Sequence, residues 1–387
     1  MKKVLVFVGG YIPGSKYGGP ISSIFNLVEA LKSDICFKIV TRDRDLGDKE
    51  TYASIVPERW NMDNDQDIFY SDSLHKSVIK IQRIILEQKP DLVYLNSIFS
   101  LGFGVLPILA IYLMRKRDKP RVLVAPRSEL LLDVIKPKYF RKTVYLNIIR
   151  ILGFYRWVEW QATSNAEIAS IKKVFPKANI HFLPNIPSYP KLLNSHDLKR
   201  NIKTLKIIFL SRISEKKNLM FLVKLLCRIE FKITLDIYGP LEDPNYWEEC
   251  KKTIVGLPAN ILCNYVGALS KDQVAQTFSL YDLFVFPTKG ENFGHVISES
   301  LSAGTPVLVS DQTPWRETGD GVITVVPLSN SESWIKTLHK YSDFNIEESK
   351  VLRNRVLDYF SKFYDSSNNT LVDYRRVMLG IKSKSSE

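Results

Sequence analysis

Short runs of apolar, often β-branched residues alternate with longer amphipathic stretches along the whole chain. This alternation is typical of parallel sheets whose strands are joined by crossover helices. The strands expected in the first half are Lys3–Val8, Phe37–Thr41, Leu92–Asn96, Val122–Ala125 and Trp160–Thr163. Those expected in the second half are Lys206–Ser211, Thr234–Tyr238, Ile261–Val266, Leu283–Pro287, Val307–Ser310 and Ile323–Val326.

A segment whose apolar residues follow neither the helix nor the strand periodicity separates the two sets of strands. Pro184–Pro190 holds three prolines, the polar stretch Asn194–Lys203 follows, and together they are typical of an interdomain linker. A chain of 387 residues is also too long for one ordinary core. We therefore expect an N-terminal domain over residues 1–200, a C-terminal domain over 201–362, and a C-terminal helix and tail over 363–387 that could return to the N-terminal domain.

The expected fold class is α/β, with two doubly wound, Rossmann-like domains. In open parallel sheets, ligands bind beyond the carboxyl ends of the strands. When a hinge joins two such domains, the cleft between them is the default active site. The sequence therefore predicts two domains that face each other across an interdomain cleft.

Charge is concentrated in the first half of the chain. Of the net charge of +13, residues 1–200 contribute +12, from 31 basic and 19 acidic residues. Such a balance suits nucleic acid, an anionic membrane or a phosphorylated substrate, and a solvated lysine-rich surface is the plain alternative. The sequence holds no recognition helix or RNA-binding signature, so no nucleic-acid partner is expected. The four cysteines lack metal-ligand spacing, which predicts reduced thiols and no zinc site.

Neither of the two most apolar segments predicts a membrane span. The run Val4–Val8 is too short for a signal peptide and fits a first strand better. Leu101–Met114 is too short to cross a bilayer and contains Pro107. We therefore expect a protein that is soluble or peripheral to a membrane.

The most informative segment is residues 287–309, which read PTKGENFGHVISESLSAGTPVLV. A strand ends here, a loop carries Glu291, and a helix begins near Phe293 or Gly294. The first N–H groups of a helix, together with its dipole, form a natural seat for a phosphate, and a glycine lets the backbone approach closely. Glu299 lies about a turn and a half into the helix, where a carboxylate can reach ribose hydroxyls, while Glu291 stays nearer the reacting sugar.

A second segment, Phe209–Leu219, contains two basic residues after the end of a strand. Arg212 follows the strand directly, and Lys217 comes five residues later at a helix start. Arginine can bind a diphosphate through two parallel bonds and lysine as a point charge. Taken by itself, this pair is better explained as ordinary surface charges than as a phosphate site. Because the acidic pair follows about 75 residues later, we favour a phosphate site.

A third segment, Gly9–Ser22, follows the first strand. Gly18 and Gly19 precede Pro20, which suits the first turn of a helix. The spacing matches neither a dinucleotide fingerprint nor a Walker loop, so neither a dinucleotide nor an ATP site is indicated. By itself, a glycine turn without a ligand is an equal alternative.

Taken in this order, the three segments resemble family 4 retaining glycosyltransferases of GT-B fold, of the type that assembles bacterial polysaccharide and O-antigen. The resemblance runs from Val4 to about Tyr364, and its strongest element is the pair of glutamates eight positions apart, Glu291 and Glu299. It implies that Glu299 binds the ribose of a nucleotide-sugar donor. It also implies that Arg212 and Lys217 bind the donor diphosphate.

The resemblance assigns the remaining site residues as well. Glu291 and the backbone of Asn292, Phe293 and Gly294 would hold the sugar and phosphate. Gly19, beside Gly18, would abut the phosphate from the N-terminal domain. Many members have a histidine that touches the donor sugar where this chain has Arg127, within Pro126–Glu129. The two catalytic candidates are therefore Glu291 and Arg127. Ser211 replaces the glycine usual before the strand-end arginine.

The implied reaction is metal-independent transfer with retention, by front-face attack of the acceptor. It needs no cofactor besides the co-substrate, a UDP- or GDP-linked sugar. Asp43 and Asp45 have the spacing of an Asp-x-Asp metal signature, but we place them in a polar loop and expect no metal. The alternatives are a non-catalytic GT-B binding subunit and a nucleotide-sugar epimerase of the same fold.

The expected acceptor is a lipid-linked oligosaccharide in O-antigen or capsule assembly. Basic and aromatic residues interleave over Lys136–Lys142 and Tyr145–Trp160, after the apolar Leu101–Met114. Cations and aromatic rings favour an anionic membrane interface. We therefore expect a cytoplasmic enzyme, peripheral on the inner face of the plasma membrane. The alternative is that Leu101–Met114 is a core helix and Tyr145–Trp160 packs under the sheet.

Overall fold

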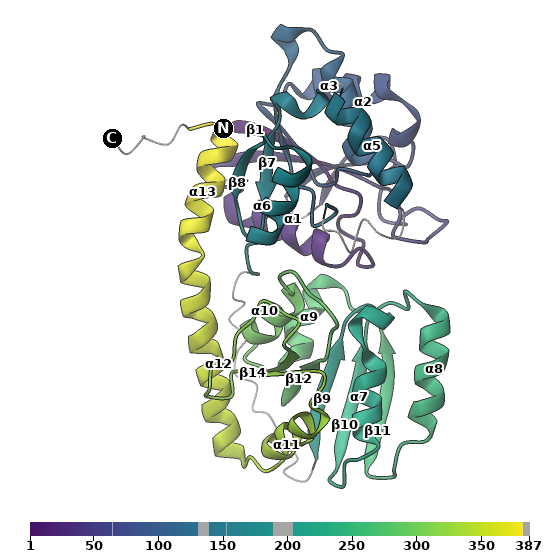
Figure 1. Cartoon of the computed structure of the whole chain (residues 1–387), viewed down its shortest axis with the longest axis vertical. Helices are drawn as coiled ribbons and strands as arrows, with labels where there is room; N and C mark the ends of the chain where they lie inside the picture. The colour runs from purple at the N-terminus through teal and green to yellow at the C-terminus, as the bar shows by residue number, and fades with distance from the viewer. Residues whose placement is uncertain (64, 131–138, 152, 189–203, 382–387) are drawn as a thin grey trace. The chain divides into compact units, whose positions relative to one another are not determined.

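The computed structural model describes residues 1–63, 65–130, 139–151, 153–188 and 204–381. They form two compact units: Met1–Ile186 with Asn368–Glu387, and Pro187–Ser367. Each unit is a sheet flanked by helices, with strands coloured purple to teal in the first unit and teal to yellow-green in the second (Figure 1). Most of the predicted linker, including Asn194–Lys203, lies outside the described residues.

The N-terminal unit is built on an eight-stranded sheet in the order β3-β4-β2-β1-β5-β6-β7-β8. Only β3 runs antiparallel to its neighbour, β4. The five strands predicted here are present, whereas β3, β4 and β8 were not predicted. The strands are β1 (Lys2–Phe7), β2 (Ile35–Thr41), β3 (Trp60–Asp63), β4 (Gln66–Tyr70), β5 (Leu92–Leu95), β6 (Arg121–Val124), β7 (Glu159–Ala162) and β8 (Asn179–Phe182).

Helices cover both faces of this sheet because its central strands are apolar on both sides. Val4 and Val6 of β1 pack against α1 (Gly19–Leu31) and α13 (Asn368–Leu379), in one core cluster. Leu5 and Phe7 face the opposite cluster. That cluster includes residues of α2 (Val78–Gln88), α3 (Leu106–Tyr112), α5 (Tyr139–Ile151) and α6 (Asn165–Val174). Single turns form η1 (Leu74–Lys76), η2 (Leu101–Val105), η3 (Lys116–Asp118) and η5 (Phe154–Trp157).

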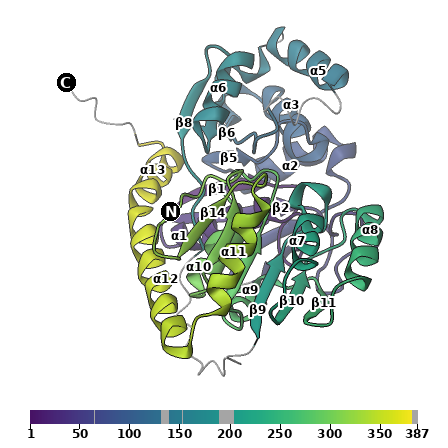
Figure 2. The ribbon, with the colours of Figure 1, turned by 60° about the horizontal axis from the view of Figure 1, so that its bottom comes forward.

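The C-terminal unit has a parallel six-stranded sheet in the order β11-β10-β9-β12-β13-β14. All six predicted strands are confirmed: β9 (Leu205–Leu210), β10 (Ile233–Tyr238), β11 (Ile261–Gly267), β12 (Leu283–Phe286), β13 (Val307–Ser310) and β14 (Ile323–Val326). The helices are η6 (Glu215–Lys217), α7 (Leu219–Leu226), α8 (Pro244–Val255), α9 (Lys271–Phe278), α10 (His295–Ser302), α11 (Ser331–Ser342) and α12 (Ile346–Ser366). Helix α7 packs against α8 and α11, while α10 packs against α9 and α12 (Figure 2).

Both sheets reverse their strand order once. In the C-terminal unit, β10 and β11 extend from one side of β9, whereas β12, β13 and β14 extend from the other. In the N-terminal unit the corresponding reversal lies between β1 and β5. At such a point the connections leave adjacent strands toward opposite faces, which opens a crevice at the carboxyl edge. The predicted α/β fold with two doubly wound sheets is confirmed.

Most of the apolar segment Leu101–Met114 belongs to the core. Phe103, Ile108 and Ile111 are buried against the sheet, whereas Leu101 and Leu113 are at least half exposed, at 50% and 60%. The core-helix alternative therefore describes most of this segment. Among the residues that the structure describes, no helix is both long and apolar enough to cross a bilayer.

Candidate functional site

The loops that follow β9 and β12 meet at the strand-order reversal of the C-terminal unit. Asn218 Nδ2 donates to the carbonyl of Pro287 at 2.9 Å, and the amide of Lys289 donates to the carbonyl of Lys216 at 2.8 Å. The Thr288 hydroxyl donates to that same Lys216 carbonyl. Because β9 and β12 are neighbours in the sheet, the predicted cations and the predicted glutamate loop arrive at one place.

Lys217 and Glu291 form an ion pair at this place. Lys217 Nζ lies 2.6 Å from Glu291 Oε2 and 5.2 Å from the centre of the Phe286 ring. The lysine side chain is only 10% exposed, and this burial lowers its pKa, although Glu291 opposes the shift. A buried cation needs an anionic partner. Glu291 is that partner in this structure.

Arg212 stands at the carboxyl end of β9, as predicted, and has an acidic partner of its own. Its Nη1 lies 2.5 Å from Glu242 Oε1, on the loop after β10. Both side chains are about one-third exposed, at 33% and 35%. A partly exposed pair of this kind contributes little to stability, so Arg212 can exchange this partner at small cost.

The predicted helix start is present, with α10 beginning at His295. Its N-cap, Gly294, has a φ of 77°, and a Cβ there would stand 2.8 Å from Ile297 and 3.1 Å from Glu291 Cγ. Glu291 therefore packs directly against the start of the helix. Asn292 is exposed and its amide donates to Glu291 Oε1 at 3.2 Å, while Glu299 lies half-buried in the second turn.

The loop that precedes α10 is held from the side of β13. The Phe293 carbonyl accepts a bond of 2.6 Å from Trp315 Nε1, and the Glu291 amide donates to the Gln312 carbonyl at 3.0 Å. The Ser310 hydroxyl donates to the carbonyl of Thr288 at 2.5 Å. These three bonds fix the loop, which is the preorganisation that an anion site needs.

Sequence reasoning missed Gly239, which supports the strand-end arginine. This glycine directly follows β10 with a φ of 134°, and a Cβ would lie 1.8 Å from the Ser211 carbonyl oxygen. Only glycine fits so close to the backbone. The one available signal was a glycine directly after a predicted strand, at Tyr238–Pro240.

In the N-terminal unit, the glycine loop opens onto α1 as expected. Gly18 is the N-cap of α1 with a φ of 64°, and Gly19 is its exposed first residue. Asp45 accepts the amides of Ser15 and Lys16, at 2.7 and 3.0 Å. The Asp45 side chain therefore fixes the loop through its backbone, which gives a structural explanation for the Asp-x-Asp spacing.

Arg127 lies after β6 in a left-handed conformation, with a φ of 50°. Its guanidinium donates to Asn96 Oδ1 at 2.7 Å, to the Tyr94 hydroxyl at 2.8 Å and to Asn185 Oδ1 at 3.0 Å. These three acceptors fix the plane of the guanidinium. Left-handed backbone is uncommon for a residue of this size, and such strain often accompanies function.

The polar network continues inward from Arg127. The Tyr94 hydroxyl donates to Gln161, whose Nε2 lies 2.6 Å from the hydroxyl of Tyr374 on α13. Tyr94, Gln161 and Tyr374 are buried. The structure thus joins Lys217, Glu291 and Gly294 in one unit, and places Gly18, Gly19 and Arg127 on the other. Sequence reasoning did not foresee Glu242, Asp45 or the partners of Arg127, because each contact joins distant loops.

Comparison with known proteins finds a family match for part of the chain. Residues 191–350 match the family described as "Glycosyl transferases group 1". A 105-residue stretch is 30% identical to "Sulfoquinovosyl transferase SQD2" of Arabidopsis thaliana, covering 27% of this chain and 19% of that protein. A second relative, the "Uncharacterized 41.2 kDa protein in cps region" of Klebsiella pneumoniae, is 23% identical over 250 residues, or 62% of this chain and 65% of that one. The chain thus matches less than two thirds of the length of either relative.

Solved structures match over nearly the whole chain. Anabaena Alr3699/HepE, in complex with UDP and glucose, aligns with a TM-score of 0.65 at 14% identity, over 98% of this chain and 99% of that one. WaaG, a glycosyltransferase involved in lipopolysaccharide biosynthesis, aligns with a TM-score of 0.63 at 14% identity, over 98% and 100% of the two chains. At such low identity the likeness shows the fold, which is GT-B.

Proposed function

We infer, from the match of residues 191–350 to the group 1 glycosyltransferases, that this protein is a retaining glycosyltransferase. It moves a sugar from a nucleotide-sugar donor to a glycan acceptor. The observation that carries the proposal is the buried Lys217–Glu291 pair, packed against the glycine start of α10 where the strand order reverses. A nucleoside diphosphate fits this place because it can replace Glu291 as the partner of Lys217.

In the proposed reaction the leaving diphosphate is stabilised by fixed positive groups. Lys217, Arg212 and the first amides of α10 oppose the charge that develops as the bond from the anomeric carbon to phosphate breaks. The acceptor hydroxyl attacks that carbon on the same face, and its proton passes to the departing phosphate oxygen. Glu299 binds the ribose, while Glu291 and the Asn292–Gly294 backbone hold the sugar and phosphate.

The N-terminal unit contributes Gly18, Gly19 and Arg127 to the same reaction in this proposal. Gly19 is exposed at the start of α1 and can approach a phosphate through its backbone. Arg127 replaces a family histidine, and its guanidinium is held in one orientation by Tyr94, Asn96 and Asn185. A fixed cation can orient a sugar hydroxyl or an acidic sugar.

The acceptor we propose is a lipid-linked oligosaccharide in bacterial surface polysaccharide synthesis. The relative from a Klebsiella cps region and the likeness to a glycosyltransferase of lipopolysaccharide biosynthesis support this context. The donor we propose is UDP- or GDP-linked, as UDP accompanies the Anabaena protein.

Arg212→Ala should weaken binding of the free nucleoside diphosphate about tenfold or more, since a charge-assisted contact contributes about 1.5–3 kcal/mol. Calorimetry with UDP and GDP, followed by turnover assays over a panel of nucleotide sugars, measures this effect and the donor together. The matched control is Glu242→Gln, which removes the competing anion and should leave affinity equal or higher. Unchanged affinity in Arg212→Ala would exclude it from the site, and binding without turnover of any donor would indicate a binding subunit.

Activity should survive removal of divalent metal, because the proposed phosphate site relies on side-chain cations and helix amides. We expect turnover after dialysis against EDTA to stay within about twofold of the untreated enzyme, well below the effect of losing one strong electrostatic contact. Adding back Mg²⁺ or Mn²⁺ should then change little. Loss of activity that either ion restores would contradict the metal-free mechanism.

The membrane-facing part of the proposal rests on exposed residues of the N-terminal unit. Val144, Ile148 and Ile151 form a row on α5 and are 42%, 48% and 77% exposed. Nearby, Lys119 Nζ lies 5.3 Å from the ring of Tyr112 and 5.7 Å from that of Trp157. Exposed apolar side chains beside aromatic rings and cations suit an anionic lipid surface. Lys136 and Lys138, named from sequence, lie outside the described residues.

Flotation with anionic liposomes should recover the protein in the lipid fraction at low salt, and less at high salt. Replacing Lys119 and Arg150 by glutamine should reduce binding about tenfold or more, because each cation near such a surface contributes about 1 kcal/mol. Replacing Ile148 and Ile151 by serine should also reduce binding, because it removes apolar surface that the lipid would cover. Val372→Ser is the matched control, being 57% exposed on α13. Absence of binding by the unaltered protein at low salt would reject the membrane face.

A further inference from the structure

An open groove of about 850 Å³ lies outside the glycosyltransferase site, between the β3–β4 edge and α2 of the N-terminal unit. A polar cluster and two aromatic rings line it. Neither the sequence motifs nor the proposed reaction uses any of these residues. Its volume lies within the range of sites that hold small organic ligands.

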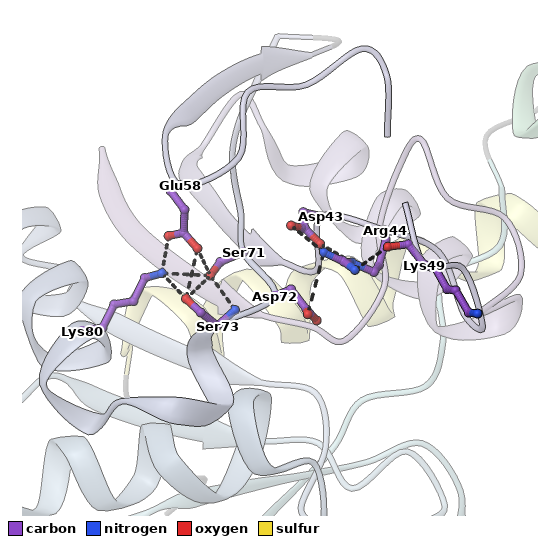
Figure 3. Close-up of polar contacts among 8 residues, drawn as sticks. All are labelled: Asp43, Arg44, Lys49, Glu58, Ser71, Asp72, Ser73 and Lys80. Carbon is purple, nitrogen blue, oxygen red and sulfur yellow. Dashed lines mark hydrogen bonds and ion pairs between the residues drawn. The ribbon is translucent and has the colours of Figure 1, made fainter. Parts of the chain in front are cut away.

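The polar cluster is centred on Lys80 and Glu58, as Figure 3 shows. Lys80 Nζ pairs with Glu58 and donates to the hydroxyls of Ser73 and Ser71, at 2.6 and 3.1 Å. Both serine hydroxyls also donate to Glu58 Oε1, at 3.1 and 2.8 Å. Burial would raise the pKa of Glu58, but the bonds from Lys80 and Ser71 outweigh it and lower that pKa. The groove therefore carries a fixed carboxylate that is 44% exposed.

The backbone holds this carboxylate under strain. Glu58 has a φ of 63°, and its amide donates to the Tyr70 carbonyl at 2.8 Å. A left-handed glutamate persists only where surrounding contacts compensate for it, and such positions concentrate at ligand sites. The backbone conformation thus helps to hold Glu58 in place at the groove.

The aromatic wall is formed by Trp60 and Phe69. Their ring centres are 5.5 Å apart, and Phe69 is buried beneath the half-buried Trp60. Lys38 Nζ lies 4.9 Å from the centre of the Trp60 ring, which fixes the indole further. A rigid aromatic surface facing fixed hydrogen-bonding groups suits a ligand with apolar C–H faces and many hydroxyls.

Charge argues against an isolated phosphate as the occupant. Lys80 is already neutralised by Glu58, and Arg83 lies 3.8 Å from Glu87. Arg59 and Arg83 are exposed on the rim. The groove therefore offers several hydrogen-bonding groups with a slight excess of positive charge, in place of a concentrated anion site.

The groove adjoins the sheet edge on which the glycine loop opens. Ser71 and Ser73 follow the carboxyl end of β4, and Asp72 between them lies 3.8 Å from Arg44, after β2 (Figure 3). In the sheet, β4, β2 and β1 are consecutive neighbours, and Gly18 follows β1. A chain-like ligand in the groove can therefore extend along this edge.

We propose that the Glu58–Trp60–Lys80 groove binds a saccharide chain, as a subsite for the part of the glycan acceptor remote from the reacting sugar. This inference rests on the proposed function and deepens it. The Glu58 carboxylate and the Ser73 hydroxyl bond sugar hydroxyls, and Trp60 packs against a sugar ring. The exposed arginines make an acidic glycan the better ligand.

The test is calorimetry of the full chain with maltohexaose, a neutral probe, and hyaluronan hexasaccharide, an acidic one. We expect one site with a dissociation constant of about 1 mM or tighter, and stronger binding of the acidic probe. Trp60→Ala and Glu58→Gln should each weaken binding about tenfold, equivalent to losing one good contact. Trp60→Phe should restore most of the affinity that Trp60→Ala loses.

Leu86→Ala is the matched control, because Leu86 is 47% exposed on α2 and does not line the groove. It should bind both probes as the unaltered protein does. The absence of binding to either hexasaccharide, or affinities that Trp60→Ala leaves unchanged, would overturn the proposal. Arg212→Ala and Glu291→Gln should retain hexasaccharide binding. The experiment therefore tests the saccharide site in the groove independently of the proposed transferase activity.

Discussion

Glu291→Gln should lower turnover of the donor by an order of magnitude or more, while the affinity for free nucleoside diphosphate stays equal or rises. Glu291 neutralises the buried Lys217, at 2.6 Å. The neutral glutamine side chain removes that competing anion, and Lys217 becomes more available to phosphate. The same change removes the carboxylate that we place beside the reacting sugar. Steady-state kinetics and calorimetry on one preparation measure the two effects.

Glu215→Gln is the control for this experiment. Glu215 pairs with Lys289 at 2.7 Å in the same pair of loops, but its side chain is 75% exposed. It should therefore leave both turnover and affinity near those of the unaltered protein. Lys217→Met should weaken the diphosphate about tenfold or more, because it removes a charge-assisted contact. Unaltered turnover in Glu291→Gln would remove the centre of the proposed mechanism.

Gly239→Ala should destabilise the C-terminal unit by about 3 kcal/mol or more, since backbone strain and a steric clash add at this position. The new Cβ would stand 1.8 Å from the carbonyl oxygen of Ser211. No rotation of a side chain relieves this clash, because the obstacle is backbone. For a unit of this size the melting temperature should fall by about 6–12 °C.

Gly267→Ala separates the contribution of backbone strain from that of the steric clash. Gly267 also has a positive φ, 108°, but a Cβ there would meet nothing within 4 Å. It should cost only the conformational strain, about 1–2 kcal/mol. Denaturant unfolding monitored by tryptophan fluorescence measures both variants. Equal losses would show that the contact with Ser211 contributes nothing, and that Arg212 does not depend on Gly239.

Periodicity predicted the central strands well because they are buried on both sides. The segments Val4–Phe7 and Phe284–Phe286 are uninterrupted apolar runs in the middle of each sheet. It missed β3 and β8, which are edge strands: Trp60–Asp63 and Asn179–Phe182 are short and half polar, and neither contains a fully buried residue. Their pairing depends on the neighbouring strand more than on their own composition. Periodicity also missed β4, which lies between β3 and β2.

The candidate site was predictable as far as spacing along the chain allows. Lys217 and Glu291 follow strands that are neighbours in the sheet, so a correct topology brings their loops together. The pairing of Arg212 with Glu242 was not predictable, because it depends on the path of the loop after β10. Asp45 was judged from its polar surroundings in sequence, yet it is 7% exposed and bonded to the glycine loop. Long-range contacts of this kind leave no periodic signal.

The position of α13 has a consequence for how the chain is made. Tyr374, Val377 and Met378 pack into the same cluster as Val4 and Val6, so the first strand and the last helix share one core. During synthesis, the whole of Pro187–Ser367 leaves the ribosome after β1 and before α13 is available. The N-terminal unit therefore waits with an uncovered apolar face while the C-terminal unit is completed. The nascent chain should be most prone to aggregation, and most dependent on chaperones, in that interval.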